Sequence, residues 1–548
     1  RKKVLLMQKV TKFNLDNMFK LPNPGLRTYL NKVKLGNQEE YRTPFYNGKP
    51  LEDILSPWMS VLEEEIGSKW PELLEFERDL ASKVGPLSIQ KPLDQRMDDI
   101  EAYWKLSDVS DIEKPPVSKA VWDQFYLEFN VIKGIRSKSL KSTVDDMRKS
   151  TNSGAPFFTK RNKVVDRSIA EAQRYLDGAK HNYVFREGQT RLLPAILGWR
   201  GQEGGPSDED VKQRVVWMFP FSYNILELSV YQPLIKACQK HNLVPAWVSM
   251  ESVDKKITQL FDSKGKEDVI ICTDFTKFDQ HFNPYCQEVA KDALTNLLTS
   301  GALSQRQWIE KIYPIKYQIP LLCSEDLLIE GEHGMASGSG GTNADETLFH
   351  RFLQHKAAVD HGSKLNLHSM CLGDDGIISY PGVTVNDVMD TYRAYGLDMN
   401  ESKQYVSTHD CVYLRRWHHN DYRIDGVCAG VYSTARALGR LAEQERFYDP
   451  EKWSKEMVAL RQLSIIENCK YHPLREKFAD YCMKGDKFRL GLDIPGFIDN
   501  ITTIAIEATD LLPDFLGYTK SMQSYESNQD PSAGIANWWI VNYLRSKR

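Results

Sequence analysis

The sequence predicts a mixed α/β (α+β) protein with several lobes, and three observations support this fold class. The chain has 548 residues, enough for roughly three or four domains or for one large protein whose lobes share a core. Between residues 222 and 425, apolar residues at helical spacing alternate with short β-like runs. On both sides of this region, at 51–150 and after 425, the pattern is mainly helical. No repeat of fixed period occurs, which disfavours solenoids and propellers.

Composition and charge place few limits on partners. Hydrophobic residues make up 41% of the chain and charged residues 26%, values that are ordinary for a globular protein. The net charge of -3 neither favours nor excludes a polyanionic partner, so a nucleic-acid surface must come from local clusters of Lys and Arg. The nine cysteines include no C-x-x-C pair, which indicates reduced thiols. No apolar run approaches the roughly 18 residues of a membrane span, so we expect a soluble protein without a membrane partner.

The N-terminal half alternates between punctuated and helical segments. Residues 1–50 are rich in Asn, Pro and Gly, as expected of an extended arm that lies over other lobes. Residues 51–150 carry apolar positions at spacings of three and four, and the helical pattern returns from Ser168 to Gly178. A Gly-rich acidic loop at 201–210 then leads into the basic, β-branched run KQRVVWMF, which predicts a hairpin.

A first acidic site follows a short strand in the middle of the chain. The apolar run 269–272 is β-like and leads into Asp274, with Asp279 five residues later. On a strand that breaks into a turn, the two carboxylates would emerge about one turn apart and could do different jobs. Taken alone, Asp274 as a helix cap and Asp279 as a solvated residue would be as reasonable an interpretation as catalysis.

A second acidic site, CLGDDG at 371–376, lies at the tip of an expected hairpin. Asp374 and Asp375 are adjacent there, and their repulsion costs energy unless a cation relieves it. A carboxylate at a strand end and a carboxylate pair together supply the hard oxygen ligands that Mg²⁺ prefers. Two ions held in this way can stabilise the attacking and leaving oxygens of a phosphoryl displacement. The sequence therefore predicts that Asp274, Asp374 and Asp375 bind two divalent ions.

Between the acidic sites, the run SGSGG at 337–341 predicts a Gly-rich loop at the start of a helix. Its bare backbone can approach a sugar or a phosphate. The buried stripe expected for the helix is Leu348, Phe349, Phe352 and Leu353. A flexible linker followed by a helix cap is the alternative interpretation of this segment alone. The G-x-x-x-x-G-K-[ST] pattern of a P-loop is absent, so the loop does not support an ATPase.

The order of these segments carries a family resemblance. The strand with DFTKFD, the loop SGSGGTN that opens a helix, and GDD on a hairpin resemble motifs A, B and C in the palm of viral RNA-dependent RNA polymerases. The wording SGSGGTNADET and LGDDG is most similar to picobirnavirus polymerases, and more distantly to partitivirus polymerases, both from small double-stranded RNA viruses. Each tripeptide is weak evidence, but the ordered set is strong.

The resemblance implies a closed right-hand polymerase with fingers, a palm of antiparallel sheet and helices, and a mainly helical thumb. The motifs span 151–419, and the flanks are assigned from the family architecture alone. The implied divisions are an N-terminal arm at 1–60, fingers at 61–230, palm with motif A at 231–284, a fingers insertion at 285–330, palm with motifs B to E at 331–424, and thumb with C-terminal tail at 425–548.

Carried over position by position, the resemblance gives each acid a role. Asp274 and Asp374 match metal ligands, with Asp375 beside them, for two Mg²⁺ or Mn²⁺ ions. Asp279 matches the residue that senses the ribose 2′-OH, where reverse transcriptases usually have an aromatic gate, so ribonucleotides are implied. The chain departs from motif B at Glu346, where an Asn is usual. The other candidates to bind the nucleotide with Asp279 are Ser337, Thr342 and Asn343.

Flanking segments match further motifs of the family. Motif F implies that Lys212 and Arg214 meet the triphosphate, and motif D implies that Lys403 protonates the leaving pyrophosphate. The implied RNA contacts from motifs G, B and E are Ser153, Gly154, Pro156, Gly338, Arg415 and Arg416. Adjacent arginines on a strand point to opposite faces, so at most one of that pair contacts RNA. His418 and His419 have no partner at metal spacing, and we interpret them as structural.

The resemblance implies an RNA-dependent RNA polymerase that transfers a nucleoside monophosphate from a triphosphate to an RNA 3′-OH. Its partners would be a single-stranded RNA template, a double-stranded RNA product, ribonucleoside triphosphates and potentially a capsid protein, in the virion interior and the host cytoplasm. One alternative is an inactive RNA-binding or scaffold protein with the same fold, although such a protein has no physical need to keep repelling carboxylates. A two-metal nuclease is another, but it gives no reason for the Ser-Gly loop.

Overall fold

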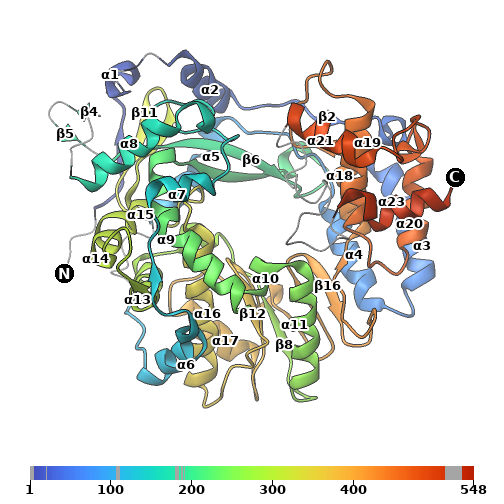
Figure 1. Ribbon diagram of the computed structural model, residues 1–548. Coiled ribbons are helices and arrows are strands. Elements are labelled where there is room, and N and C mark those ends of the chain that lie inside the picture. The colour runs from blue at the N-terminus through green and yellow to red at the C-terminus, as the bar shows by residue number, and fades with distance from the viewer. Residues whose placement is uncertain are drawn as a thin grey trace.

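The computed structural model describes residues 5–19, 21, 23–105, 112–178, 184–186, 189–190, 192–512 and 534–548, and its elements form a ring (Figure 1). One side of the ring is a mixed group of helices and strands, one is a sheet with helices on both faces, and one is helical. The α+β class expected from the sequence is confirmed. No helix in the described part of the chain is long and apolar enough to cross a membrane.

The largest sheet has the strand order β1-β11-β10-β6-β7. Its strands are β1 (Gln8–Val10), β6 (Ala195–Gln202), β7 (Lys212–Met218), β10 (Leu321–Ser324) and β11 (Leu327–Glu330). The hairpin expected from the Gly-rich acidic loop and the basic run after it is β6 with β7, paired from Ile196 with Met218 to Gln202 with Lys212. This hairpin extends across the top of the ring towards the helical side (Figure 1).

A four-stranded antiparallel sheet, in the order β12-β13-β8-β14, carries both acidic segments. Its strands are β8 (Ile270–Thr273), β12 (Met370–Leu372), β13 (Asp375–Ile378) and β14 (Tyr405–Ser407). Ile270 and Cys272 pack with α11 (Met250–Ser263), whereas Ile271 belongs to the core that contains α16 (Thr342–Asp360). Since successive side chains point to opposite faces, a strand covered on both faces is apolar at every position.

The helix α16 is buried almost all round, which differs from the single apolar stripe expected. All residues from Ala344 to Ala358 are buried, polar ones included. The polar side chains are paired: Arg351 donates to Glu128, and Gln354 donates to the carbonyls of Met370 and Ile377. Burial of polar groups is tolerated when each finds a hydrogen-bond partner, so the sequence pattern understated how central this helix is.

The helical side of the ring combines an N-terminal pair of helices, α3 (Leu51–Ile66) and α4 (Pro71–Lys83), with the C-terminal helices. The C-terminal helices are α18 (Thr434–Ala442), α19 (Lys455–Glu467), α20 (Arg475–Lys484), α21 (Ile501–Leu511) and α23 (Trp539–Ser546), and they share one core with α3 and α4. Glu77 of α4 accepts hydrogen bonds from the backbone N–H groups of Thr434 and Ala435, which start α18. The segment 61–230, expected to form the fingers, therefore contributes to two different cores.

The remaining elements support these three groups. A small sheet of β15 (Asp410–Tyr413), β16 (Arg416–His419) and β17 (Val431–Tyr432) joins the four-stranded sheet to the helical side. The other helices are α1 (Leu15–Phe19), α2 (Pro24–Leu35), α5 (Leu93–Lys105), α6 (Lys119–Phe129), α7 (Leu140–Asp145), α8 (Val165–Leu176), α9 (Phe221–Lys240), α10 (Pro245–Val248), α12 (Phe278–His281), α13 (Pro284–Leu297), α14 (Gln305–Gln307), α15 (Ile315–Gln318) and α17 (Val385–Arg393). The short strands are β2 (Tyr41–Arg42), β3 (Ile135–Arg136), β4 (Val184–Arg186), β5 (Gln189–Thr190), β9 (Leu298–Thr299) and β18 (Glu443–Gln444).

Candidate active site

The two acidic segments meet at one edge of the four-stranded sheet. Gly376 of β13 pairs with Thr273 of β8, so Asp375 and Asp274 come together where these antiparallel strands end. Leu372 pairs with Asp375, which leaves Asp374 in the turn of the hairpin. Asp274 and Asp374 are exposed, and Asp375 is partly buried. The two acidic segments, which the sequence predicts to bind metal ions together, therefore face one another.

The carboxyl groups of this acidic site repel one another. The surrounding protein displaces water from Asp274, which raises its pKa. The charge of Lys403 opposes this rise, and the charge of Asp374 adds to it. Burial raises the pKa of Asp375 to about 7, and the charge of Asp374 adds to that rise. Partial loss of hydration likewise raises the pKa of Asp374, although its side chain is exposed. A set of carboxylate oxygens under mutual repulsion fits divalent cations, which these side chains can bind while leaving positions for water and phosphate.

Gln404, which the sequence analysis did not single out, holds the backbone of Asp274. Its Oε1 accepts from the Asp274 N–H at 2.8 Å, and its Nε2 donates to the Asp274 carbonyl at 2.9 Å. Nε2 also donates to the Asn400 carbonyl at 2.9 Å, and Gln404 is buried. The clamp depends on the pairing of β14 with β8, so no local sequence signal could have found it.

The turn that carries Asp374 is fixed by α16 and by the β15–β16 turn. The Gly373 N–H donates to Thr347 Oγ1 at 2.9 Å, and His350 Nδ1 lies 2.9 Å from the Gly373 carbonyl. Burial lowers the pKa of His350 to about 4, so the ring is neutral at pH 7 and donates to that carbonyl from Nδ1. The Leu414 N–H donates to Asp375 Oδ2 at 2.8 Å.

The Gly-rich loop 337–341 packs against the backbone of β7. A Cβ atom on Gly338 would lie 1.5 Å from the Trp217 carbonyl oxygen, so only glycine allows this approach. Ser337 Oγ donates to the Val215 carbonyl at 3.2 Å and accepts from the Trp217 N–H at 3.4 Å. The loop and the basic strand are therefore in direct backbone contact.

A buried carboxylate of α9 accepts hydrogen bonds from the same loop. Glu227 accepts from the Gly340 N–H at 3.1 Å and from the hydroxyl of Ser339. Asn224 donates both to Glu227, at 3.2 Å, and to the Gly338 carbonyl, at 3.2 Å. Glu227 was not predicted from the sequence, because its role depends on a contact more than a hundred residues away.

Asp279 is paired with Glu346, the residue at the position where the motif is unusual. The two carboxyl groups hydrogen-bond to each other, which requires that one of them holds a proton. Burial raises the pKa of Glu346 well above its ordinary value, so Glu346 is the protonated partner. Burial raises the pKa of Asp279 to about 6.

The other candidate nucleotide ligands of the loop and helix are engaged by the protein. Thr342 Oγ1 donates to the Ala336 carbonyl at 3.0 Å, which stabilises the loop. Asn343 is exposed, and its Oδ1 accepts from Trp247 Nε1 at 2.7 Å. The structure therefore brings Glu346, rather than these residues, to Asp279.

Two basic side chains of β7 face the acidic site. Lys212 and Arg214 are both exposed and, being two residues apart on a strand, lie on the same face, as the sequence predicts. Asp274 is near enough to Lys212 to act on its pKa, and Arg214 lowers the pKa values of Asp279 and Asp374. The arrangement can hold a polyanion between basic side chains and bound cations, which suits a triphosphate.

Comparison with known proteins identifies the protein family of this chain. Residues 88–426 match the model of the viral RNA-dependent RNA polymerase family. The chain is 56% identical, over 97% of its length and 98% of the relative, to a potential RNA-dependent RNA polymerase of human picobirnavirus. The chain belongs to the viral RNA-dependent RNA polymerase family.

Solved structures of picobirnavirus RNA-dependent RNA polymerases have the same fold. The crystal structure of the RNA-dependent RNA polymerase of a human picobirnavirus superposes with a TM-score of 0.87 and 53% identity, over 97% of this chain and 99% of that one. An insertion-loop deletion mutant of a human picobirnavirus polymerase gives a TM-score of 0.85 and 51% identity, over the same shares. The right-hand polymerase fold and RNA-dependent RNA synthesis, both implied by the sequence motifs, are confirmed. Polymerases of this family act on RNA and nucleotides and generally use divalent metal ions.

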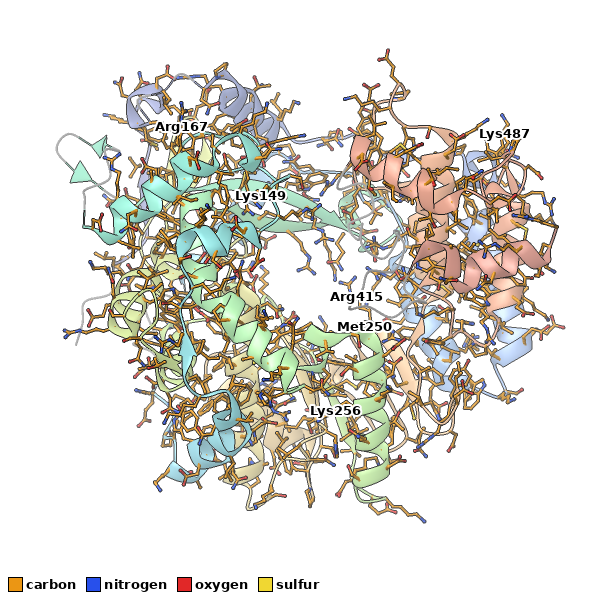
Figure 2. All side chains as sticks on the ribbon, viewed as in Figure 1. Lys149, Arg167, Met250, Lys256, Arg415 and Lys487 are labelled. Carbon is orange, nitrogen blue, oxygen red and sulfur yellow. The ribbon has the colours of Figure 1, made fainter. Side chains whose placement is uncertain are left out.

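In this polymerase the two arginines of the expected motif E differ in surroundings. Arg416 makes a bidentate pair with Asp254, at 2.9 and 3.1 Å, and is mostly buried. Arg415 is exposed and lies on the inner side of the ring (Figure 2). Of the pair, Arg415 is the one whose guanidinium is open to a ligand.

The polymerase buries the three residues of the expected motif G. Ser153, Gly154 and Pro156 are all buried, and Gly154 has a φ of +64°, in the region that favours glycine. The Asn23 side chain donates to the Phe157 carbonyl at 2.9 Å, which ties this loop to the N-terminal arm. Contact of these three residues with RNA stays a prediction.

Lys403 of the polymerase ends the short turn Glu401–Lys403, next to Gln404, and is exposed. Its charge lowers the pKa of Asp274, so it lies within electrostatic reach of the acidic site. This position is compatible with a proton donor near the triphosphate, and the role itself stays a prediction.

A cluster of Glu72, His409 and His419 lies apart from the acidic site, with ligand-type atoms within 4.8 Å of one another. His409 Nε2 is 2.7 Å from Glu72, which joins α4 to the β14–β15 turn. His419 Nδ1 accepts from the Asp421 N–H at 2.9 Å, so a neutral ring carries its proton on Nε2, the atom that faces Glu72. This contact fits a structural role for His419, and His418 bonds to the Cys428 carbonyl at 2.9 Å.

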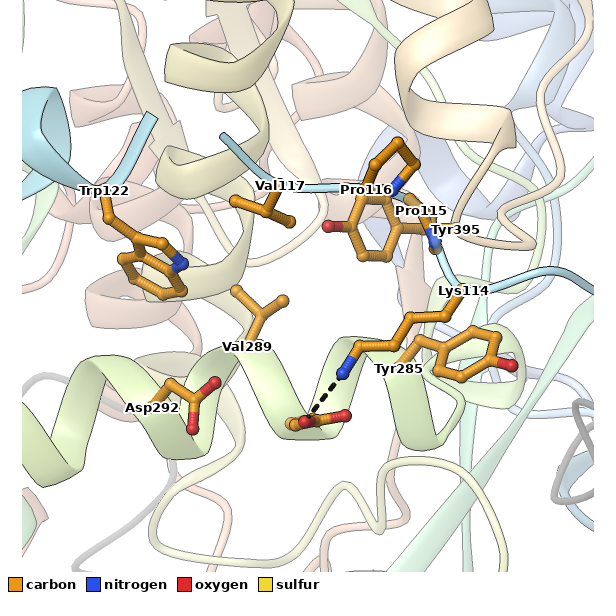
Figure 3. A pocket seen from close by; sticks show the side chains of 10 residues that line it. Lys114, Pro115, Pro116, Val117, Trp122, Tyr285, Val289, Asp292 and Tyr395 are labelled. Atoms are coloured by element: carbon orange, nitrogen blue, oxygen red, sulfur yellow. Dashed lines mark hydrogen bonds and ion pairs between the residues drawn. The ribbon is translucent and has the colours of Figure 1, made fainter. Parts of the chain in front are cut away.

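A pocket of about 400 Å³ is also remote from the acidic residues (Figure 3). It lies between α13 and the segment 114–117, and Trp122 and Tyr395 form part of its lining. Lys114 pairs with Glu288 across its edge at 2.9 Å. None of the residues predicted to bind nucleotide or RNA lines this pocket.

Proposed function

We propose that Asp274, Asp374 and Asp375 hold two Mg²⁺ ions for RNA-dependent RNA synthesis. The observation that carries this assignment is the meeting of β8 and β13, which brings repelling carboxylates to one sheet edge. When bound, such ions supply activation of the RNA 3′-OH and neutralisation of the triphosphate. Gln404 holds the backbone of Asp274, and the Leu414 N–H binds the carboxylate of Asp375. Mn²⁺ is an alternative ion with the same ligand preference.

Basic residues on two sides of the acids would bind the nucleotide. Lys212 and Arg214 neutralise the triphosphate from β7, since both are exposed and lie within electrostatic reach of the acidic site. Lys403, which lies just before β14, approaches the acidic site from that strand and donates a proton to the leaving pyrophosphate. Ser337 and Gly338 hold the loop on which the nucleotide would rest.

We propose that Asp279 and Glu346 together select ribonucleotides. A protonated Glu346 donates to Asp279 as an Asn amide would, so Asp279 keeps an acceptor for the ribose 2′-OH. Thr342 and Asn343 would act through the shape of the loop and helix start. The expected result is that Asp279→Asn lowers discrimination between UTP and dUTP by about 10-fold or more, the scale of a lost hydrogen bond to a charged group. Glu346→Gln should retain discrimination, whereas Glu346→Ala should not.

The RNA path would follow from the lobes. We infer an arm, fingers, palm and thumb with the divisions that the family resemblance implies, except that α3 and α4 act with the thumb, whose core they share. Template would enter past the loop with Ser153, Gly154 and Pro156, and product would leave past Arg415. The polymerase would work in the host cytoplasm and inside the virion, with the capsid protein as a partner, which copurification of polymerase with assembled capsids would test.

The test is incorporation of labelled ribonucleotides on a single-stranded RNA template with Mg²⁺. Asp374→Ala should lower synthesis at least about 100-fold, since it removes a metal ligand at an exposed turn. Asp268→Ala, at the other end of the same sheet, is the matched control and should keep activity within about threefold. Equal loss in both variants, or full activity of Asp374→Ala, would reject the metal-site assignment. Replacement of Mg²⁺ by Mn²⁺ or Ca²⁺ in the same assay identifies the ion.

A further inference from the structure

Three arginines from two segments of the chain converge on one carboxylate. Glu203, just after β6 in the long hairpin, lies 2.7 Å from Arg436 Nε, 3.8 Å from Arg440 Nη2 and 3.9 Å from Arg415 Nη1. Arg436 and Arg440 are one turn apart on α18, and Arg415 is in the turn between β15 and β16. We call Arg415, Arg436 and Arg440 the arginine cluster.

The three arginines of the cluster carry one positive charge more than the two carboxylates beside them, Glu203 and, at Arg440, Glu445. Glu203 faces three guanidinium groups, and its side chain is only 11% exposed. Burial acts to raise the pKa of Glu203, but the charges of Arg440 and Arg436 and the hydrogen bond from Arg436 hold it down at about 2. Within the described residues, Glu203 Oε2 and Arg440 Nε have no hydrogen-bond partner. Several guanidinium groups around one oxyanion is the arrangement that proteins use to bind phosphate.

The arginine cluster is continuous with the active site through Arg415. The charge of Arg415 lowers the pKa values of Asp374 and Asp375 on one side. On the other side, Arg415 contacts Glu203 and is near enough to Arg436 and Arg440 for their charges to lower its own pKa. Figure 2 shows Arg415 on the inner side of the ring. An RNA strand that leaves the acidic site would therefore meet the cluster next.

We propose that the arginine cluster is a binding site for a backbone phosphate of RNA, and that Glu203 occupies this site when RNA is absent. The inference rests on the RNA path proposed above through Arg415 and extends it to α18. Exchange of one anion for another keeps the charge balance of the three arginines, so the phosphate replaces the carboxylate without leaving a buried cation unpaired. In the RNA-free polymerase, Glu203 also links the β6–β7 hairpin to α18. RNA binding releases this link.

The test is the affinity of Glu203→Gln for RNA. A fluorescein-labelled 12-nucleotide single-stranded RNA is titrated with polymerase in EDTA without nucleotides, and anisotropy is measured from 50 to 300 mM NaCl. Because the variant removes the competing anion and keeps the side-chain shape, we expect RNA to bind at least fivefold more tightly at 50 mM NaCl. The slope of log affinity against log salt should steepen by up to about 0.7, the value for one added phosphate contact with a single strand.

A matched control separates the site from a general charge effect. Glu445 lies 3.7 Å from Arg440 and 3.9 Å from Arg200 but pairs with neither Arg415 nor Arg436. Glu445→Gln removes the same charge and should change RNA affinity less than twofold. Arg436→Gln in the Glu203→Gln background should cancel the gain, since it removes the nearest guanidinium.

Affinity of Glu203→Gln equal to or weaker than wild type, with an unchanged melting temperature, would overturn the proposal and leave Glu203 as a structural link. An equal gain in Glu445→Gln, or a gain that survives Arg436→Gln, would overturn it as well. The assay needs no synthesis, so it is independent of the proposed metal ligands. If the polymerase synthesises RNA but Glu203→Gln shows no gain in RNA affinity, only the phosphate site is rejected. If Glu203→Gln shows the gain but the polymerase does not synthesise RNA, only the catalytic assignments are rejected.

Discussion

Replacement of Gln404 by Ala tests whether the backbone of Asp274 must be held for catalysis. The change removes three hydrogen bonds, two to Asp274 and one to the Asn400 carbonyl, from a buried side chain. At about 0.5–1.5 kcal/mol for each bond, the expected loss of unfolding free energy is about 2–4 kcal/mol. With an unfolding entropy of about 2.1 cal/mol/K per residue, this lowers the melting temperature by about 2–4 °C.

The expected effect on synthesis is larger than the effect on stability. The pairing of β14 with β8 remains, so Asp274 stays in the site but is less well oriented. Since a misplacement of about 1 Å can cost 100-fold in rate, we expect kcat to fall about 10- to 100-fold while the KM for nucleotide changes less than threefold. Single-nucleotide incorporation on a primed RNA template measures both constants.

Gln287→Ala is the matched control for this prediction. Gln287 donates to the carbonyls of Phe282 and His333, at 2.9 and 3.0 Å, and neither carbonyl belongs to the strands β8 and β13 that carry the acidic site. It should lower stability by a similar amount and leave kcat within threefold. If Gln404→Ala loses stability but keeps kcat like this control, the orientation of Asp274 does not depend on the clamp, and the reasoning is wrong.

Three further changes test the loop, the arm and the helical side. Gly338→Ala places a Cβ atom against the Trp217 carbonyl, so we expect synthesis to fall at least about 100-fold in a protein whose circular dichroism is unchanged. Burial and the neighbouring Glu40 raise the pKa of Glu443 to about 9, so the folded state keeps a proton there and stability falls as pH rises from about 5 towards 9. Glu443→Gln should therefore raise the melting temperature at pH 8 and leave it unchanged at pH 5. Glu77→Ala leaves the start of α18 without its buried acceptor and should cost about 3–5 kcal/mol, seen as a lower melting temperature that Glu77→Gln partly restores.

The sequence predicts those parts of the active site that are local in the chain. Asp374 and Asp375 stand beside each other within one turn, and Asp274 follows its own strand directly, so pattern and order were enough to find them. The alternation of Lys212 and Arg214 is local in the same sense.

The residues that position these groups were beyond reach of sequence reasoning. Gln404 acts through a strand pairing 130 residues away, and Glu203 meets Arg436 across 233 residues. Glu346 was recognised as unusual, but its contact with Asp279 depends on how α16 packs against the turn after β8. The apolar spacing predicted only one buried face for α16, because the partners of its buried polar side chains lie on other elements.

The shared core of α3, α4 and the C-terminal helices has a consequence for synthesis of the chain. Trp58 of α3 is packed in one core with Val541 of α23, so the apolar faces of α3 and α4 wait for helices that are synthesised more than 400 residues later. At 5–20 residues per second, that wait is roughly 25–100 s. During this time, residues 51–83 must be covered by a chaperone or by transient contacts. Translation that stops before α23 leaves the apolar faces of α3 and α4 exposed. Premature termination should therefore yield aggregated protein rather than a soluble truncated polymerase.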